Sequence, residues 1–367
     1  MSMNRRSDID IAKGFALFLV VLGHVVTMHH TIFRWIYAFH MPAFFFLSGM
    51  TFRPEKYPSC LDYIKKRGQT LILPYFAITL TALAICTIRP YYHQAISEYG
   101  WKHILKWIFY YGQPQQIYTG QLWFLPALFF AGLYALVWLR IFDQKHIVTR
   151  CYALTVLILA GTYIRLADPL IPVMERLPWK LDSALCAAVF LIAGYYTNRT
   201  KLLEKMMPYA GFLIPFFVAL SFFFGPKLSE YVNLCDCRYT APPYYFGAAF
   251  SGIFALLLTA KLAALPAVSG SVFSRFWPPL HASFFHSELR PLLLCGAYSA
   301  HHRRGIKAYG MDANQAFHLC ADCSHLRPDL SHWLALGLLQ TQKSRHLIFQ
   351  VPALIFLSHA LHRNAFQ

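Results

Sequence analysis

Residues Asp8–Met50 read DIDIAKGFALFLVVLGHVVTMHHTIFRWIYAFHMPAFFFLSGM. Two apolar runs, at about Ile11–Met28 and Phe33–Met50, flank a short polar break. Each run is long enough to cross the bilayer core as a helix, since that core is about 30 Å thick. His24 and His40 lie inside these runs. An ionisable side chain at membrane depth is costly to insert, so it indicates a functional site. We therefore expect the site of this protein to be built around His24.

The composition of the 367-residue chain indicates a polytopic membrane protein. Hydrophobic residues make up 57% of the chain and charged residues only 13%, whereas soluble domains carry about 25% charged residues. The apolar runs lack the alternation of β-strands, so we predict helices rather than a barrel. No small-residue cleavage site follows the first run, so we expect no cleavable signal peptide. Six further runs complete an all-α transmembrane helical bundle of eight recognisable spans, and they are Thr70–Ile88, Gln121–Leu139, Cys151–Leu166, Leu181–Thr197, Pro208–Gly225 and Tyr244–Leu262.

The formal net charge of +17 does not indicate a nucleic-acid-binding protein. The basic residues lie at the ends of the spans rather than on one face, as signals that orient a membrane protein do. They predict a cytoplasmic N-terminus and contact with membrane lipid. The cytoplasmic segments would be Met1–Asp10, Thr51–Gln69, Arg140–Arg150, Asn198–Met207 and the end of the eighth span. The outer loops would be Arg89–Gly120, Ala167–Lys180 and Pro226–Pro243, and we expect no disulfide framework from the nine cysteines.

The chain from about residue 264 to 367 differs in character from the transmembrane domain of residues 1–263. Ten of the seventeen histidines lie between His281 and His362. No sustained helical or strand periodicity is present, which argues against a folded soluble domain. One choice of codons for Phe276–Ala282, read one base later, encodes Phe-Gly-Arg-His-Ser-Met. We hypothesise that this atypical tail is out of frame and has low order, which sequencing the gene across residues 260–285 would test.

The tail also contains the pattern His318-x-Cys320-x-x-Cys323-x-His325. These residue types can bind zinc, but the ligands are crowded and lack the usual loop between the two pairs. We therefore expect no metal site.

Several short motifs occur in order between Arg5 and Leu262. They are Asp10-x-x-Lys13-Gly14, Val20-Val21-Leu22-Gly23-His24, Phe39-His40-Met41-Pro42, Phe44-Phe45-Phe46-Leu47-Ser48-Gly49, Lys65-Lys66-Arg67 before Leu73-Pro74-Tyr75-Phe76, Gln121-Leu122-Trp123-Phe124-Leu125, and Leu181-Asp182-Ser183-Ala184 with Gly194. Taken together they resemble the acyltransferase-3 family of integral-membrane acyltransferases. The most similar branch contains fucose 4-O-acetylase-like and related membrane O-acetyltransferases.

The resemblance implies about ten spans in the bacterial cytoplasmic membrane and the transfer of an acyl group to a hydroxyl. It implies acyl-CoA, most simply acetyl-CoA, as the donor and a carbohydrate or glycolipid precursor as the acceptor, with no further cofactor. The sequence departs from the family pattern at Lys13, where many members have an arginine ahead of the histidine. Lysine cannot bind a phosphate or carboxylate in the bidentate way of arginine. A Gly-x-x-Ser-Met-like stretch of the family is also missing in this reading frame.

The two histidines are the expected catalytic residues. A sugar hydroxyl is a poor nucleophile at neutral pH, and a positioned imidazole can take its proton as the acyl carbonyl is attacked. We expect His24 to be this general base and His40 to orient it or bind the acceptor. The alternatives are a helix-packing histidine for His24 and an interfacial histidine for His40.

Five further residues are expected to bind the two substrates. Lys13 and Arg67 would meet the phosphates of the donor, and Asp10 would pair with Lys13 on one helix face. Asp182 and Trp123 would hold the acceptor. The alternatives are topology signals for the basic residues, a helix N-cap for Asp182 and an interfacial anchor for Trp123.

Two other functions agree with the composition. One is a transporter or flippase for a lipid-linked sugar, although the sequence has no internal repeat of the kind that transporters show. The other is an inactive product of a disrupted acyltransferase gene.

Overall fold

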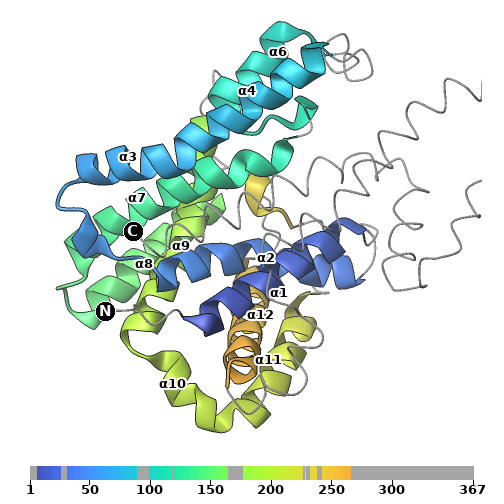
Figure 1. The fold of residues 1–367 in the computed structure, drawn as a ribbon. Helices are drawn as coiled ribbons and strands as arrows, with labels where there is room; N and C mark the ends of the chain where they lie inside the picture. Colours follow the sequence, from blue (N-terminus) through green and yellow to red (C-terminus); the bar gives the residue numbers. More distant parts are fainter. Residues whose placement is uncertain are drawn as a thin grey trace, which may run out of the picture. The chain divides into compact units, whose positions relative to one another are not determined.

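The computed structural model describes residues 6–25, 31–88, 99–117, 119–163, 177–225, 228, 232–237 and 242–265, without the side chains of residues 24, 25 and 116. Over these residues the chain is helical, as the sequence predicts (Figure 1). The eight main helical segments are α1 (Ser7–Val25), α2 (Thr31–Met50), α3 (Cys60–Arg67) with α4 (Leu73–Ile88), α7 (Phe124–Phe142), α8 (Ile147–Tyr163), α9 (Leu181–Arg199), α11 (Ala210–Phe224) and α12 (Pro242–Ala263). Nearly all of the tail predicted to begin at residue 264 lies outside the described residues, so its order and reading frame stay predictions.

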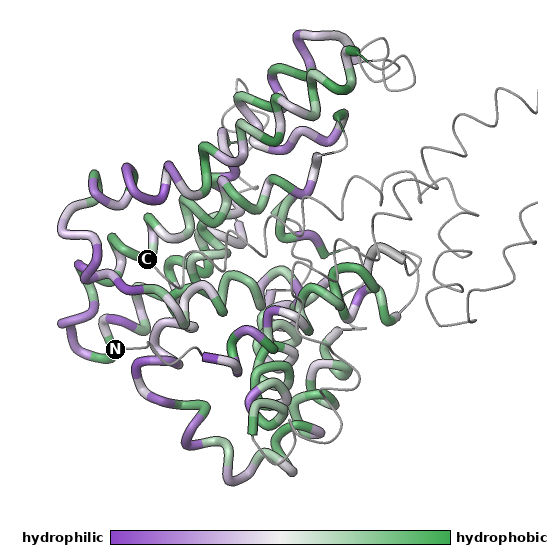
Figure 2. The backbone as a smooth tube through the Cα atoms, viewed as in Figure 1, coloured by the Kyte–Doolittle hydropathy of each residue, from purple (hydrophilic) through white to green (hydrophobic). Residues whose placement is uncertain are grey.

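Each of the eight predicted spans corresponds to one of these segments. Among the described residues, four helical stretches are long and apolar enough to cross a membrane, and they are Cys60–Ile88, Gly120–Phe142, Leu202–Phe224 and Pro242–Ala263. The helix α8 is apolar but shorter. The helices α1, α2 and α9 have 19 or 20 residues and carry charged residues near their ends. Figure 2 shows hydrophobic residues along the helices and hydrophilic ones mostly near helix ends and in α3 and α10 (Leu202–Met206).

The third span begins earlier than the sequence predicts. The helix starts at Cys60 instead of Thr70, because Ser59 and Asp62 form a capping box that supplies its first hydrogen bonds. The π-helical turn η2 (Gly68–Ile72) joins α3 to α4 without a break. The basic residues Lys65–Arg67 therefore lie on a helix, where neighbouring residues point in different directions, and not in a loop.

The outer loop expected at Arg89–Gly120 contains a helix of its own. In its described part, α6 (Trp101–Lys106) continues into the π-helical turn η3 (Trp107–Tyr111). Ile104 and Ile108 are buried with Cys86 of α4, and the Tyr75 hydroxyl donates a hydrogen bond of 2.8 Å to the Ile108 carbonyl. The loop is thus held to α4 by apolar contacts as well as by a buried hydrogen bond.

The core is centred on the crossing of α2 and α9. Most side chains of both helices are buried. The crossing is close because Gly49 of α2 lies against the Leu191 carbonyl, and Gly194 of α9 lies against the Phe46 carbonyl. Small residues allow membrane helices to approach each other in this way.

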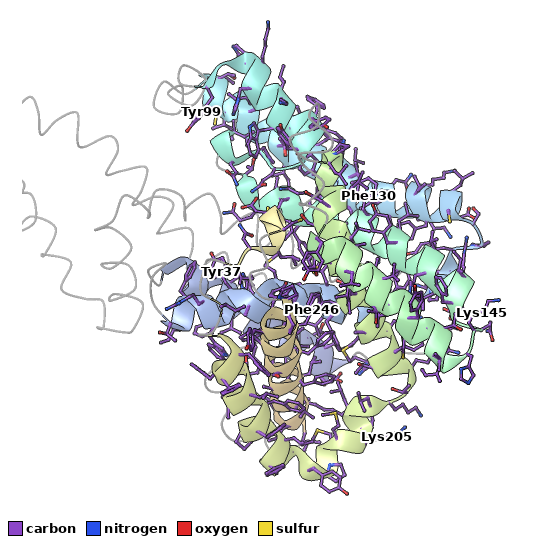
Figure 3. The ribbon with its side chains drawn as sticks, turned by 180° about the vertical axis from the view of Figure 1, so that it is seen from behind. Tyr37, Tyr99, Phe130, Lys145, Lys205 and Phe246 are labelled. Carbon is purple, nitrogen blue, oxygen red and sulfur yellow. The ribbon has the colours of Figure 1, made fainter. Side chains whose placement is uncertain are left out.

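The helix α12 covers another side of α2. Gly252 faces the Phe39 ring, and a Cβ at that glycine would come within 2.5 Å of it. Phe190 of α9 stacks on Phe246 of α12, which is labelled in Figure 3, at a centroid distance of 5.5 Å. The helix α11 lies beside α12, where Ser221 donates a hydrogen bond to the Ala248 carbonyl. The apolar core therefore includes residues from α2, α9 and α12, and partly buried side chains of α11 pack against it.

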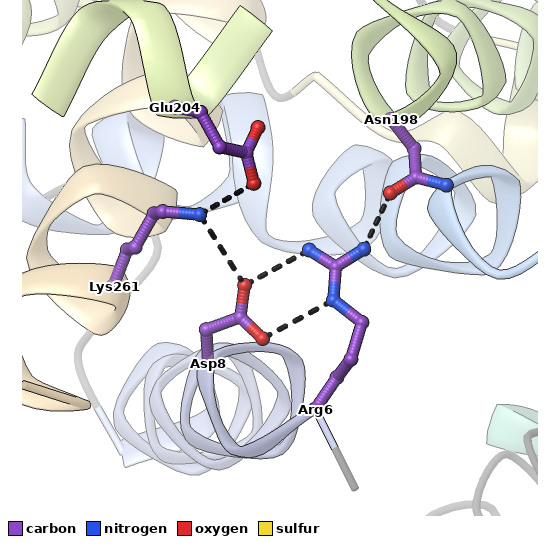
Figure 4. Close-up of polar contacts among 5 residues, drawn as sticks. All are labelled: Arg6, Asp8, Asn198, Glu204 and Lys261. Atoms are coloured by element: carbon purple, nitrogen blue, oxygen red, sulfur yellow. Dashed lines mark hydrogen bonds and ion pairs between the residues drawn. The ribbon is translucent and has the colours of Figure 1, made fainter. Parts of the chain in front are cut away.

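Ionic contacts join the helix ends that the sequence predicts to be cytoplasmic. Asp8 binds Arg6 at 2.9 Å and lies 4.0 Å from Lys261, which in turn binds Glu204 at 2.7 Å (Figure 4). Arg6 also donates a hydrogen bond to Asn198. These contacts bring together the start of α1, the end of α9, the start of α10 and the end of α12.

The end of α7 joins the same group of helix ends. Arg199 of α9 binds Asp143 at 2.7 Å, and Arg140 donates hydrogen bonds to the carbonyls of Tyr57 and Pro58. All the segments predicted to be cytoplasmic are thus linked at one end of the helices. Which membrane face this end occupies stays a prediction.

The Asp143 contact predicts a pH-dependent stability. Burial alone would raise the pKa of the Asp143 carboxyl, but hydrogen bonds from Arg199 and Tyr196 outweigh burial and hold that pKa below 3.8. A lowered folded-state pKa stabilises the protein above about pH 4, and this stability is lost as the pH falls through the folded-state value. Because Arg199 is half exposed, we expect Asp143→Asn to cost at most about 1 kcal/mol at pH 7.

Thermal unfolding in detergent between pH 7 and pH 3 tests whether the Asp143 carboxylate stabilises the protein in a pH-dependent way. The difference in melting temperature between the parent and Asp143→Asn should shrink toward zero at the acid end. A difference that is the same at every pH would contradict the assignment.

Candidate functional site

The two histidine-bearing helices, α1 and α2, pack against each other. His24 is the penultimate residue of α1, and its side chain lies outside the described residues. Gly23, immediately before it, packs on α2, where an added Cβ would meet Tyr37 at 3.1 Å and Ile36 at 3.3 Å. Tyr37, labelled in Figure 3, lies edge-on to His40 at a centroid distance of 4.7 Å. Tyr37 is therefore a shared neighbour of the α1 backbone at Gly23 and of the His40 ring.

The contacts of His40 define which ring nitrogen carries the proton. The side chain is buried, and its Nδ1 lies 2.8 Å from the carbonyl oxygen of Ile36. A carbonyl oxygen can only accept, so in this hydrogen bond Nδ1 is the donor. In a neutral imidazole the lone pair is then on Nε2. His40 thus has the tautomer of a base whose reactive nitrogen is Nε2.

A cluster of basic side chains lies at the predicted cytoplasmic end, on α3 and on the segment that joins α2 to α3. Burial and then the positive charges of Arg53, Arg67 and Lys66 lower the pKa of Lys56. Arg67 also lies close to Tyr63, and its buried Nε has no hydrogen-bond partner among the described residues. A buried donor of this kind calls for a partner such as a ligand oxygen. This basic cluster (Arg53, Lys56, Lys66 and Arg67) could bind a phosphate.

The other predicted donor-binding residues, Asp10 and Lys13, lie on α1. Both side chains are half-buried. They are one turn apart on the same helix, as their spacing predicts, and Lys13 lies eleven residues before His24. The structure thus places the predicted donor-binding residues on two separate helices, α1 and α3.

A buried polar cluster joins the three predicted outer loops. Lys180, only 2% exposed, donates hydrogen bonds to the side-chain oxygen of Gln113 and, at 3.1 Å, to the carbonyl of Cys235. The Ser183 hydroxyl donates to the same carbonyl at 3.0 Å, and the Cys237 thiol donates to Ser183. We call these residues (Gln113, Lys180, Asp182, Ser183, Cys235 and Cys237) the outer polar cluster. A buried lysine is costly unless its donors are satisfied, so these contacts fix the three loops together.

The backbone before α9 is strained at the outer polar cluster. Trp179 and Lys180 have φ values of 56° and 61°, in the left-handed region that residues with a side chain rarely adopt. Such residues persist only where their surroundings hold them, and they often mark functional sites. The contacts of Lys180 with Gln113 and Cys235 supply that restraint.

Asp182 and Trp123 are both buried, at 4% and 8% exposure. Asp182 is the second residue of α9, and its Oδ1 accepts a 2.7 Å hydrogen bond from the Ser183 backbone N–H. It is therefore a carboxylate at a helix N-terminus, a favourable position for negative charge, although Lys180 holds the N-cap position itself. Trp123 packs against Phe45 and Phe124, with centroids 6.5 and 6.3 Å away, and so is a core residue rather than an exposed anchor.

The model of the acyltransferase-3 family, described as an acyltransferase domain, matches residues 6–320. The chain belongs to this family. Its apolar helices and this domain indicate an integral membrane protein with an acyl-transferring domain. The match continues past Leu262, the end of the motifs quoted above. No curated protein and no solved structure matches the chain.

Sequence reasoning missed Lys180 and its partner Gln113. The lysine was placed at the end of an outer loop, where an exposed topology signal is the usual interpretation. A lysine directly before a mostly apolar helix, with an aspartate two residues on, was the available signal. Gln113 gave no local signal at all, because it is 67 residues away from Lys180.

Proposed function

We propose that this acyltransferase transfers an acetyl group from acetyl-CoA to a hydroxyl of a cell-surface carbohydrate or glycolipid precursor. In the proposed step, His24 takes the proton of the acceptor hydroxyl as its oxygen attacks the thioester carbonyl. The C–O bond forms, the C–S bond breaks, and the thiolate of CoA leaves with a proton returned by the imidazolium. The observation that carries the proposal is the family match over residues 6–320.

The geometry of His40 supports a pair of histidines at this site. Its Nδ1 is engaged by the Ile36 carbonyl, which holds the ring in place and leaves the lone pair on Nε2. Gly23 and His40 both contact Tyr37, so His24 and His40 belong to neighbouring parts of the α1–α2 pair. His40 would orient the acceptor hydroxyl or the His24 ring.

The basic cluster and the outer polar cluster support a site in which the donor and the acceptor bind from opposite sides of the membrane. The basic cluster with Arg67, together with Lys13 and Asp10, would hold the phosphates of acetyl-CoA at the cytoplasmic side. The outer polar cluster, which includes Asp182, would bind the acceptor on the other side together with Trp123. In this proposal the N-terminus lies in the cytoplasm and the chain lies in the bacterial inner membrane.

Membranes that contain the protein, incubated with radiolabelled acetyl-CoA, test the activity. We expect label to enter glycan, and His24→Ala to lower this rate by about 10²- to 10⁴-fold, the usual contribution of a general acid–base group. The amount of protein inserted in the membrane is measured for both, so that loss of activity is not loss of protein. Full activity in His24→Ala would refute its role as the base, and glycan movement without label would favour a transporter.

A further inference from the structure

A groove of about 570 Å³ runs along the helix Cys60–Ile88, and its lining contains neither His40 nor a residue of the outer polar cluster. Its volume lies in the range of about 300–1,000 Å³ that is typical of ligand pockets. The second wall is formed by Phe129 and Phe130 of α7, the latter labelled in Figure 3. One end is closed by Trp179, whose ring contacts Phe76 at a centroid distance of 5.4 Å. The walls are almost entirely apolar.

The groove has free space where the helix Cys60–Ile88 changes from α-helical to π-helical geometry. Gly68 begins the π-helical turn η2 and lines the groove. A Cβ added at Gly68 would meet no atom within 4 Å, so the missing side chain leaves free space. Single π-helical turns inside α-helices are frequent at functional sites. A larger residue at this position would project into the space without a clash.

Lys65 gives the groove a charged end. Its side chain is exposed and lines the groove one turn before Gly68. The segment 53–67 around it contains five basic and two acidic residues. One of the acids, Asp62, already accepts hydrogen bonds from the backbone and hydroxyl of Ser59. This end of the groove therefore carries excess positive charge.

The length of the groove matches one leaflet of a membrane. Lys65 and Phe76 are eleven residues apart, or about 16 Å at 1.5 Å per residue. Half of a bilayer core is about 15 Å. A chain that starts at the charged end would thus extend over about the depth of one leaflet before it reaches Trp179.

We propose that this groove binds one anionic phospholipid, with an acyl chain lying over Gly68 toward Trp179 and the phosphate at Lys65. An apolar trough alone accepts any lipid chain, whereas the positive end selects a headgroup with net negative charge. The lipid would be a resident ligand of the fold, distinct from the acyl donor and the acceptor.

Quenching of Trp179 by lipids with brominated acyl chains measures this binding. The signal is the difference between the parent and Trp179→Phe in detergent, since the chain has eight tryptophans. We expect phosphatidylglycerol to quench at lower concentration than phosphatidylcholine. Gly68→Leu fills the groove and should weaken binding at least tenfold, whereas Gly211→Leu, at another glycine with open surroundings, should not. Native mass spectrometry of the same variants counts bound lipid without relying on Trp179.

Removal of the Lys65 charge distinguishes selection of the lipid headgroup from binding of the acyl chain. Lys65→Gln should lower the preference for phosphatidylglycerol over phosphatidylcholine by about fivefold. The control is Lys145→Gln, an exposed lysine that follows the end of α7 and is labelled in Figure 3. Equal binding of the two lipids by the parent, or parental binding by Gly68→Leu, would overturn the proposal. Displacement of the lipid by CoA alone would assign the groove to the donor and overturn it as well.

Discussion

Gly194→Ala is expected to destabilise the protein by about 3 kcal/mol or more, at the upper end of what overpacking costs. The added methyl group would overlap the carbonyl oxygen of Phe46 and lie 3.1 Å from the backbone nitrogen of Met50. Backbone atoms cannot rotate away as a flexible side chain can. The helices α2 and α9 would have to move apart, and both are central to the core.

The control for this prediction is Gly211→Ala in α11. A Cβ at Gly211 meets no atom within 4 Å, so the substitution should be neutral or stabilise the helix by about 0.4–1 kcal/mol. Heating in detergent followed by size-exclusion chromatography gives the melting temperature of each variant. A Gly194→Ala protein that melts with the parent would show that the α2–α9 approach is looser than described.

The approximate positions and the order of the main helices could be predicted because they depend on local composition. A run such as Tyr244–Leu262 is apolar over the length of a bilayer core, whatever it packs against, and it forms α12 (Pro242–Ala263). The lysine and arginine bias likewise grouped the helix ends, as the contacts of Arg6, Lys261 and Arg199 confirm. These properties need no knowledge of tertiary structure.

The features that depend on contacts between distant residues could not be predicted. The partner of Lys180 is Gln113, and the oxygen that binds both Lys180 and Ser183 belongs to Cys235, more than 50 residues along the chain. The π-helical turn at Gly68–Ile72 has no sequence signature. One extra residue in a helical turn changes which side chains face the neighbouring helices, but it does not change how hydrophobic the segment is. Gly49 and Gly194 were quoted as parts of motifs, yet only the structure shows that they meet at one crossing.

A large loss of acetylation rate is also expected on substitution of His40. Two substitutions there distinguish a structural role of the side chain from a chemical one. Asn places an amide nitrogen near the position of Nδ1, so His40→Asn can keep the hydrogen bond to the Ile36 carbonyl while removing Nε2. If His40 acts only by packing, His40→Asn should retain most of the acetylation rate.

If Nε2 contacts the acceptor or His24, His40→Asn should lose about 10²-fold or more of the rate, although the protein folds and melts as the parent does. His40→Gln is the complementary variant, because its amide reaches the position of Nε2 but gives up the Ile36 bond and cannot act as a base. We expect it to recover binding of the acceptor, seen as an unchanged KM, without recovering kcat. Since the carbonyl of Ile36 fixes Nδ1 as the donor, the lone pair can be only on Nε2 in the neutral ring, and an active His40→Asn protein would therefore remove His40 from the chemistry altogether.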